Sequence, residues 1–136
     1  MECPFCNASE DRVFLHGDQV LGLWDAYPVL PGHALLIPRR HIPTWFEATA
    51  VEHVALVSAI DEAKAVIEKH HRPDGYNIGI NCGAAAVQTI FHLHVHLIPR
   101  YQGDVGEPRG GVGHIIADKA NYLSQSVSRP DDSTSG

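Results

Sequence analysis

The chain has 136 residues, of which 44% are hydrophobic, and its formal net charge is −6. This length suits one globular domain that buries roughly two thirds of its unfolded surface. The negative charge argues against a general nucleic-acid or anionic-membrane binder and leaves room for a small phosphorylated ligand held by local donors. The sequence has no apolar run long enough to cross a bilayer and does not begin like a signal peptide, so we expect a cytoplasmic protein.

The first predicted elements are three strands. Residues 13–16 and 20–24 flank Gly17 and Asp18, a pattern that indicates a hairpin. A Pro-Gly turn then precedes the apolar run 34–37, which is closed by a proline. We therefore predict a hairpin followed by a buried third strand.

A long helix is predicted after these strands. Thr44 with Glu47 and Thr49 with Glu52 both match a capping box, in which the first side chain and the fourth satisfy each other's backbone N–H. We expect the helix to run from 49 to about 70, where a Pro-Asp-Gly sequence stops it. The residues that we assign to its buried face are Val51, Val54, Ala55, Ile60, Ala63 and Ile67.

The second half of the chain adds further strands. Residues 76–81 alternate between apolar and polar, and small residues then lead into a histidine-rich run at 90–99. These patterns predict an α+β fold with a mainly antiparallel sheet of about five strands, one long helix and a short one. We expect residues 1–123 to form a single domain and residues 124–136 to form a disordered tail.

Three histidines at alternate positions are the most informative feature of the sequence. On a strand, His92, His94 and His96 would share one face and span about 13 Å. Imidazole changes charge near neutral pH, ligates metals and can act as a nucleophile, so this face carries chemistry. The residues that would point the opposite way, into a core, are Phe91, Leu93, Val95 and Leu97.

A Cys-x-x-Cys motif at Cys3 and Cys6 forms a second cluster. This spacing allows two thiolates to grip one zinc ion, which then needs two further histidine or carboxylate ligands. A redox pair fits less well, because no strand precedes Cys3. Two small apolar side chains in a turn remain a third interpretation. Cys82 stands alone, as expected of a small buried or loop residue.

The run from Gln88 to Arg100 resembles the signature of the histidine-triad (HIT) nucleotide hydrolase and transferase superfamily, His-x-His-x-His followed by apolar residues. The segment 31–41, Pro-Gly-His-Ala-Leu-Leu-Ile-Pro-Arg-Arg-His, resembles the family's second strand, and the likeness extends over roughly residues 1–122. The chain is most similar to the bacterial branch that hydrolyses diadenosine tetraphosphate. A HIT-like fold and a homodimer are implied.

The resemblance implies a nucleotide hydrolase or nucleotidyltransferase that acts at the α-phosphate of dinucleoside polyphosphates or nucleoside phosphoramidates. His94 would attack phosphorus and form a nucleotidyl-histidine that water hydrolyses. His96 would contact a phosphoryl oxygen or protonate the leaving oxygen. Gln88 and Thr89 would contact the phosphate, and Asn81 would join them from the neighbouring strand. Asp25 lies where relatives bind the ribose hydroxyls. Nucleotide is the expected partner; nucleic-acid polymers and membranes are not.

The resemblance also implies a structural zinc ion. Its ligands in zinc-bearing relatives correspond here to Cys3, Cys6, His41 and His92, with His33 as the competing ligand. A His92 that binds zinc cannot offer the same nitrogen to phosphate, so phosphate contact is left to the other residues.

Two departures from the family pattern concern the phosphate loop. Val87 occupies a position where many relatives have glycine, and the three alanines at 84–86 provide no polar contact for a long polyphosphate, so the leaving group could be smaller than a second nucleotide.

Two other functions remain open. One is a metal-dependent hydrolase that uses triad histidines as ligands, and the other is a nucleotide-binding protein with little turnover.

Overall fold

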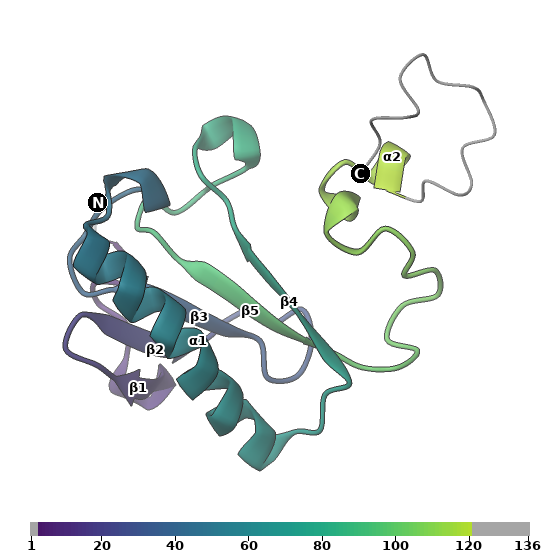
Figure 1. Ribbon diagram of the computed structural model, residues 1–136, viewed down its shortest axis with the longest axis horizontal. Helices are drawn as coiled ribbons and strands as arrows, with labels where there is room; N and C mark the ends of the chain where they lie inside the picture. The colour runs from purple at the N-terminus through teal and green to yellow at the C-terminus, as the bar shows by residue number, and fades with distance from the viewer. Residues whose placement is uncertain (1–2, 121–136) are drawn as a thin grey trace. The chain divides into compact units, whose positions relative to one another are not determined.

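The computed structural model describes residues 3–120. Its strands and helices form an α+β fold, which confirms the expected fold class. Within that range five strands lie in the order β1-β2-β3-β5-β4, and every neighbouring pair is antiparallel. The long helix α1, Ala50–His70, lies across one face of this sheet (Figure 1). The strands are β1 (Val13–His16), β2 (Val20–Trp24), β3 (Ala34–Pro38), β4 (Gly75–Ile80) and β5 (Val95–Arg100).

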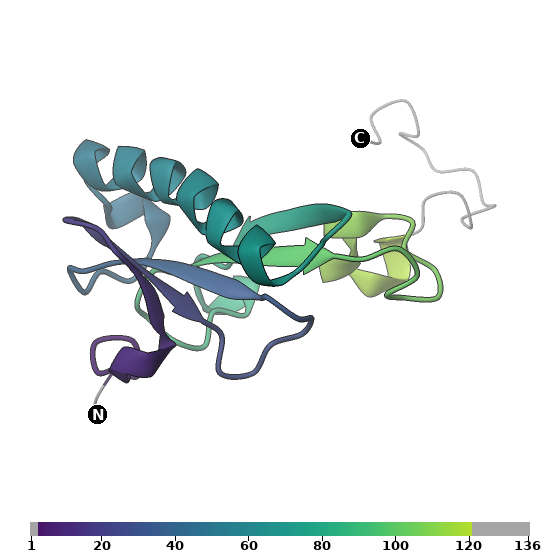
Figure 2. The same cartoon turned by 90° about the horizontal axis from the view of Figure 1, so that it is seen from below.

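Strand β3 is buried on both faces of the sheet. Ala34 and Leu36 belong to the core beneath α1, whereas Leu35 and Ile37 belong to a second core that includes Phe5. Successive side chains of a strand point to opposite faces, so this alternation follows from the backbone itself. The sheet therefore has the helix on one side and the N-terminal turn on the other (Figure 2).

The helix begins as its capping signals predict. Thr49 accepts a hydrogen bond from the Glu52 N–H at 3.1 Å, and the Glu52 carboxylate accepts one from the Thr49 N–H at 2.8 Å. The Thr44 and Glu47 pair forms a second capping box at a short 3-10 turn just before it. These reciprocal bonds satisfy backbone donors that a helix start leaves without partners.

The buried face of α1 differs from the predicted one. Val51 and Val54 are 62% and 67% exposed, so their assignment to the core is wrong. Leu56 lies in the core instead. With 3.6 residues per turn, a residue five positions after Val51 lies on a different side of the helix, and valines at 51, 54 and 57 follow the outer side. The buried positions are Glu52, Leu56, Ala59, Ala63 and Ile67.

Strand β5 is shorter than the predicted histidine strand. It starts at Val95, so His92, which lies in a bend, and His94 both precede it. Leu93 points into the core beneath α1, as predicted, and is 1% exposed. Phe91 is 48% exposed, and its assignment to the core is wrong because the chain bends at residues 90–92.

Residues 105–120 form a second compact unit that contains the short helix α2, Ala117–Ala120. The tail predicted at 124–136 and the domain end predicted at 123 lie outside the described residues. Across residues 3–120, none of the helices combines the length and apolar character that crossing a bilayer requires.

The first helical turn contains a buried charge. Glu52 is 3% exposed, and its carboxylate accepts hydrogen bonds from Arg40 Nη2 at 2.8 Å and Arg40 Nε at 3.0 Å. This guanidinium, together with the Thr49 N–H, lowers the pKa of Glu52 from 4.5 to about 2. The carboxylate therefore ties the loop at Arg40, which follows β3, to the start of α1.

We expect Glu52→Gln to lower the free energy of unfolding at pH 7 by about 1–2 kcal/mol, after allowance for the half-exposed arginine. Because its pKa is lowered in the folded state, the ionised Glu52 carboxylate stabilises the fold fully above pH 4.5. This stabilisation is lost as the pH falls toward 2. Urea unfolding between pH 2 and 7 should show wild type and variant converging in acid. Glu62→Gln, at an exposed position of α1, is the matched control; equal losses in both variants contradict the assignment.

Candidate metal centre and nucleotide site

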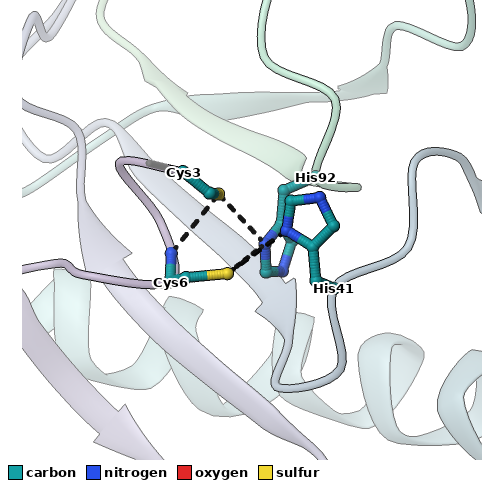
Figure 3. A group of neighbouring side chains, drawn as sticks. All are labelled: Cys3, Cys6, His41 and His92. Atoms are coloured by element: carbon teal, nitrogen blue, oxygen red, sulfur yellow. Dashed lines mark hydrogen bonds between the residues drawn. The ribbon is translucent and has the colours of Figure 1, made fainter. Parts of the chain in front are cut away.

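Two thiols and two imidazoles meet at one point on the face of the sheet opposite α1. Cys3 and Cys6 lie on the N-terminal turn, His41 follows β3, and His92 precedes β5 (Figure 3). Their candidate ligand atoms all lie within 4.8 Å of one another. The Cys6 N–H also points at Cys3 Sγ, at 3.4 Å, which folds the turn so that both sulfur atoms face the histidines.

The His92 ring has a defined tautomer. Its Nε2 lies 2.8 Å from the Pro38 carbonyl oxygen, which can only accept, so Nε2 carries the hydrogen. Nδ1 is then unprotonated and faces Cys3 Sγ at 3.4 Å and Cys6 Sγ at 3.5 Å. Burial lowers the pKa of His92 and keeps the ring neutral. A ligand histidine with its other N–H on a backbone carbonyl is the usual arrangement around zinc.

The donor set fits a tetrahedral zinc ion. With Zn–S of about 2.3 Å and Zn–N of about 2.1 Å, sulfur and nitrogen ligands should be about 3.6 Å apart. The observed separations are 3.4 and 3.5 Å for His92, and 3.2 Å between Cys6 Sγ and His41 Nδ1. Partial desolvation and the neighbouring Cys3 raise the pKa of the Cys6 thiol, so a cation would be needed to hold both sulfurs as thiolates. His41, and not His33, lies with the cysteines.

His94 also has a defined tautomer. Its Nδ1 donates to the His92 carbonyl oxygen at 2.8 Å, which leaves the lone pair on Nε2. The ring is 8% exposed and makes an edge contact with Phe5, with ring centroids 4.9 Å apart. The unprotonated Nε2 of a neutral imidazole can attack an electrophile without first losing a proton.

His33 connects the remaining triad histidine to an acid. The Val29 N–H donates to His33 Nδ1 at 3.2 Å, so the ring hydrogen must be on Nε2. Nε2 lies 3.0 Å from His96 Nδ1 and donates its hydrogen to that nitrogen, while Asp25 Oδ2 lies 3.3 Å from the same Nε2. His96 accepts on Nδ1 and therefore carries its hydrogen on Nε2.

His96 is neutral in this site. Burial, together with the neighbouring His94 and His33, lowers the pKa of His96 from 6.5 to about 4. The ring therefore serves as a hydrogen-bond donor through Nε2 over the whole physiological pH range. In β5 it pairs across the sheet with Leu35 of β3, which places it on the same face as the second core.

Asp25, His33 and His96 also place three candidate ligand atoms within 4.8 Å of one another. The tautomer argues against a metal at this second group. His33 Nε2 can ligate only if the ring hydrogen moves to Nδ1, where the Val29 N–H already points. Metal binding would therefore set two N–H groups against each other. A hydrogen-bonded chain explains the same distances without this conflict.

Gln88 closes the loop that precedes the triad. Its Nε2 donates to the Pro43 and Ile90 carbonyls at 2.6 and 3.0 Å, and its Oε1 accepts the Gly83 N–H at 2.8 Å. The side chain is 4% exposed. Both amide hydrogens are thus used on the backbone, which gives Gln88 a role in holding the loop. Its predicted donation to phosphate would require these bonds to rearrange, and it stays a prediction.

The other predicted substrate residues are Asn81, Thr89 and Asp25, of which Asp25 lies beside His33. Asn81 follows β4 directly and is half-buried, and Thr89 is exposed beside Gln88. The Asp25 Oδ1 atom accepts the Tyr27 N–H at 2.8 Å, while Oδ2 faces His33. The proposed contacts of these residues with a nucleotide stay predictions.

Sequence reasoning underestimated two residues. The sequence pattern indicates His33 as the competing zinc ligand and assigns no role to Phe5. The signal for His33 was its position immediately before β3, but its partner depends on the pairing of β3 with β5, which is more than 60 residues away along the chain. Phe5 could have been noticed because a large apolar side chain inside a Cys-x-x-Cys turn must pack against something.

An antiparallel sheet with one long helix on one face and the histidines of the triad on the other defines a class of α+β proteins. A HIT domain model matches residues 7–103, and the chain belongs to the HIT family.

Relatives and solved structures support this placement. The AP-4-A phosphorylase of Mycobacterium tuberculosis is 35% identical over 76% of this chain and 53% of its own length. The asymmetrical bis(5'-nucleosyl)-tetraphosphatase of Schizosaccharomyces pombe is 42% identical over 59% of this chain and 44% of its own length. The chain thus spans about half the length of these enzymes. A zinc-bound histidine triad family protein from Mycobacterium smegmatis is 29% identical, with a TM-score of 0.67, over 91% of this chain and 93% of that one.

We expect the purified protein to bind about one zinc ion per chain. His41→Gln should weaken zinc binding by more than about 100-fold, because it removes a ligand. His33→Gln is the matched control, and it should keep wild-type affinity. Competition with a chromogenic chelator measures both. Loss of zinc in His33→Gln with retention in His41→Gln would reverse the ligand assignment.

Val87 is the one non-glycine residue in the described range with a positive φ, 65°, and its side chain is 72% exposed. A β-branched residue in this left-handed region costs about 1–2 kcal/mol, whereas glycine loses about 0.5–1 kcal/mol of chain entropy. Val87→Gly should therefore raise the free energy of unfolding by about 0.5–1 kcal/mol in urea titrations. Val87→Ala, which keeps Cβ, should gain less. A destabilised glycine variant would show that the valine side chain contributes packing.

Proposed function

We propose that the protein transfers a nucleoside monophosphate from a dinucleoside polyphosphate to His94 and then to water. The observation that carries this proposal is the pair of opposite tautomers on neighbouring rings. His94 has a lone pair on Nε2 because Nδ1 donates to the His92 carbonyl. His96 has a hydrogen on Nε2 because Nδ1 accepts from His33. One nitrogen is ready to attack phosphorus and the other is ready to stabilise a phosphoryl oxygen.

The two steps balance with these protonation states. His94 Nε2 attacks the α-phosphorus, the new N–P bond forms, and the bond to the bridging oxygen breaks. The remaining phosphate chain leaves with the electron pair of that bond. Water then attacks the same phosphorus and the N–P bond breaks, so His94 recovers its lone pair. One water hydrogen stays on the released nucleotide and the other passes to solvent.

The state of His96 supports a phosphate leaving group. A polyphosphate chain departs as an anion and needs no proton, whereas the amine of a phosphoramidate does. Because the pKa of His96 is lowered to about 4, the ring is neutral at pH 7, and giving up its Nε2 hydrogen would leave an imidazolate. His96 therefore suits the role of hydrogen-bond donor. Among the two predicted substrate classes, the site favours dinucleoside polyphosphates.

The names of the relatives support the same class. An AP-4-A phosphorylase and a bis(5'-nucleosyl)-tetraphosphatase share this domain, and both names refer to dinucleoside polyphosphates. The zinc ion would be held by Cys3, Cys6, His41 and His92, where it would fix the geometry of the segment before β5. A homodimer and a cytoplasmic location are part of the same proposal and rest on the sequence.

The alternative of a metal-dependent hydrolase draws on the second group of possible ligands, Asp25, His33 and His96. The Val29 N–H on His33 opposes it, as described above. A nucleotide-binding protein with little turnover would use the same pocket without forming a covalent bond.

A labelling experiment distinguishes these functions. Full-length protein is incubated with diadenosine tetraphosphate labelled at the α-phosphates and is quenched in alkali, which preserves a phosphorus–nitrogen bond. We expect label on the wild type, none on His94→Ala, and a fall in kcat/KM of at least about 1,000-fold in that variant. His53→Ala is the control, because that ring stacks on Trp45 away from the triad.

Activity that survives in His94→Gly and disappears with chelator would favour the metal-dependent hydrolase. Equilibrium binding of adenosine monophosphate, with no turnover of the tetraphosphate or of an adenosine phosphoramidate, would favour the binding protein. Faster turnover of the phosphoramidate at pH 7 would overturn the preference for a phosphate leaving group.

A further inference from the structure

The segment that carries His94 is tied to the cysteine and histidine cluster through its backbone. His92 turns its side chain toward both thiols and its carbonyl toward His94 Nδ1. The Leu93 N–H donates to the Ile42 carbonyl at 2.7 Å, directly after His41 in the sequence. The backbone beside His94 is therefore held at two points, by His92 itself and by the residue that follows His41.

Phe5 supplies a third connection, this time through a side chain. It lies between the two cysteines of the turn and is 5% exposed. Its ring meets the His94 ring edge-on, with centroids 4.9 Å apart and an interplanar angle of 68°. It also contacts the His92 ring, at 6.0 Å. An aromatic edge contact of this kind restricts the rotation of the imidazole that it touches.

The turn that carries Phe5 is closed by hydrogen bonds to the Cys3 carbonyl. The Asn7 N–H donates to the Cys3 carbonyl at 3.2 Å, and the Asn7 side chain donates to the same oxygen at 3.3 Å. Cys6 is exposed, and no strand or helix of the described range includes residues 3–7. An ion that grips both sulfurs and both histidines would fix this turn against the sheet, and with it the Phe5 ring.

We propose that Phe5 is a positioning residue that couples the metal centre to His94. A metal ion held by Cys3, Cys6, His41 and His92 fixes the turn, the turn fixes Phe5, and Phe5 holds the His94 ring so that Nδ1 stays on the His92 carbonyl and Nε2 points outward. The role of the ordered ring in catalysis rests on the proposed function, whereas the coupling itself concerns only ring order and metal binding.

The coupling is tested in the full-length protein by NMR of nitrogen-15-labelled histidine at one fixed pH. In zinc-loaded wild type we expect one His94 Nδ1–H signal that exchanges slowly with water and shows Overhauser contacts to the Phe5 ring. Stripping the zinc should make this signal exchange at least about tenfold faster. Phe5→Leu should show the same faster exchange while the protein still binds zinc.

The matched control is Phe14→Leu, the same change at a ring that stacks on Trp24 in the core beneath α1. It should leave the His94 signal unchanged. A slowly exchanging His94 Nδ1–H in zinc-loaded Phe5→Leu overturns the proposal. If Phe5→Leu does not fold, an unchanged His94 signal after zinc is stripped from the wild type overturns it equally.

Single-turnover labelling provides the link to catalysis. Zinc-loaded Phe5→Leu should form the nucleotidyl-histidine about tenfold more slowly than wild type, with KM little changed, because a misaligned nucleophile affects the transition state more than substrate binding. Absence of covalent label in the wild type would refute the proposed function and leave the NMR result as the test of the coupling. A wild-type labelling rate in zinc-loaded Phe5→Leu would contradict the positioning role.

Discussion

The hydrogen bond from His92 Nε2 to the Pro38 carbonyl determines how the rest of the site is arranged. It is 2.8 Å long and lies on a ring with no solvent exposure, so water cannot replace either partner. Because Nε2 keeps its hydrogen, Nδ1 must face the two thiols, and the ring plane fixes the direction of the His92 backbone. The carbonyl of the same residue then accepts the His94 hydrogen. This one buried bond thus orients both His92, the candidate metal ligand, and His94, the candidate nucleophile.

Backbone groups set all of the tautomers in this row of histidines. The Pro38 carbonyl orients His92, the His92 carbonyl orients His94, and the Val29 N–H orients His33 and, through it, His96. Main-chain carbonyls and amides keep a fixed role as acceptor or donor, so each neutral ring has one preferred tautomer. Three identical side chains at equal spacing therefore acquire different chemistry from their surroundings, without a charged partner for each.

Features that depend on local chain chemistry could be predicted from the sequence. Both capping boxes, the first hairpin and the end of α1 follow from residues within a few positions of one another, and all are present. Features that depend on distant partners could not. The outward face of Val51 and Val54 is decided by the sheet that α1 covers, and the role of His33 by a strand more than 60 residues away. The hydrogen bonds from the Gln88 amide to the Pro43 and Ile90 carbonyls were likewise not predictable, because Pro43 lies 45 residues away along the chain.

Strand β5 starts only at Val95, which leaves His92 and His94 outside the sheet, and a proline in the neighbouring strand explains this start. β3 and β5 pair from Ala34 with Leu97 to Leu36 with Val95, and two residues further the same register would bring Pro38 opposite Leu93. Pro38 has no N–H to donate, so the ladder stops there, and its carbonyl remains available for His92. The Leu93 N–H is likewise free to bond to Ile42. A histidine strand as long as the alternating pattern predicts would have committed these groups to the sheet. The histidines keep their alternation, but two of them leave the ladder, and this departure gives each ring its own partner.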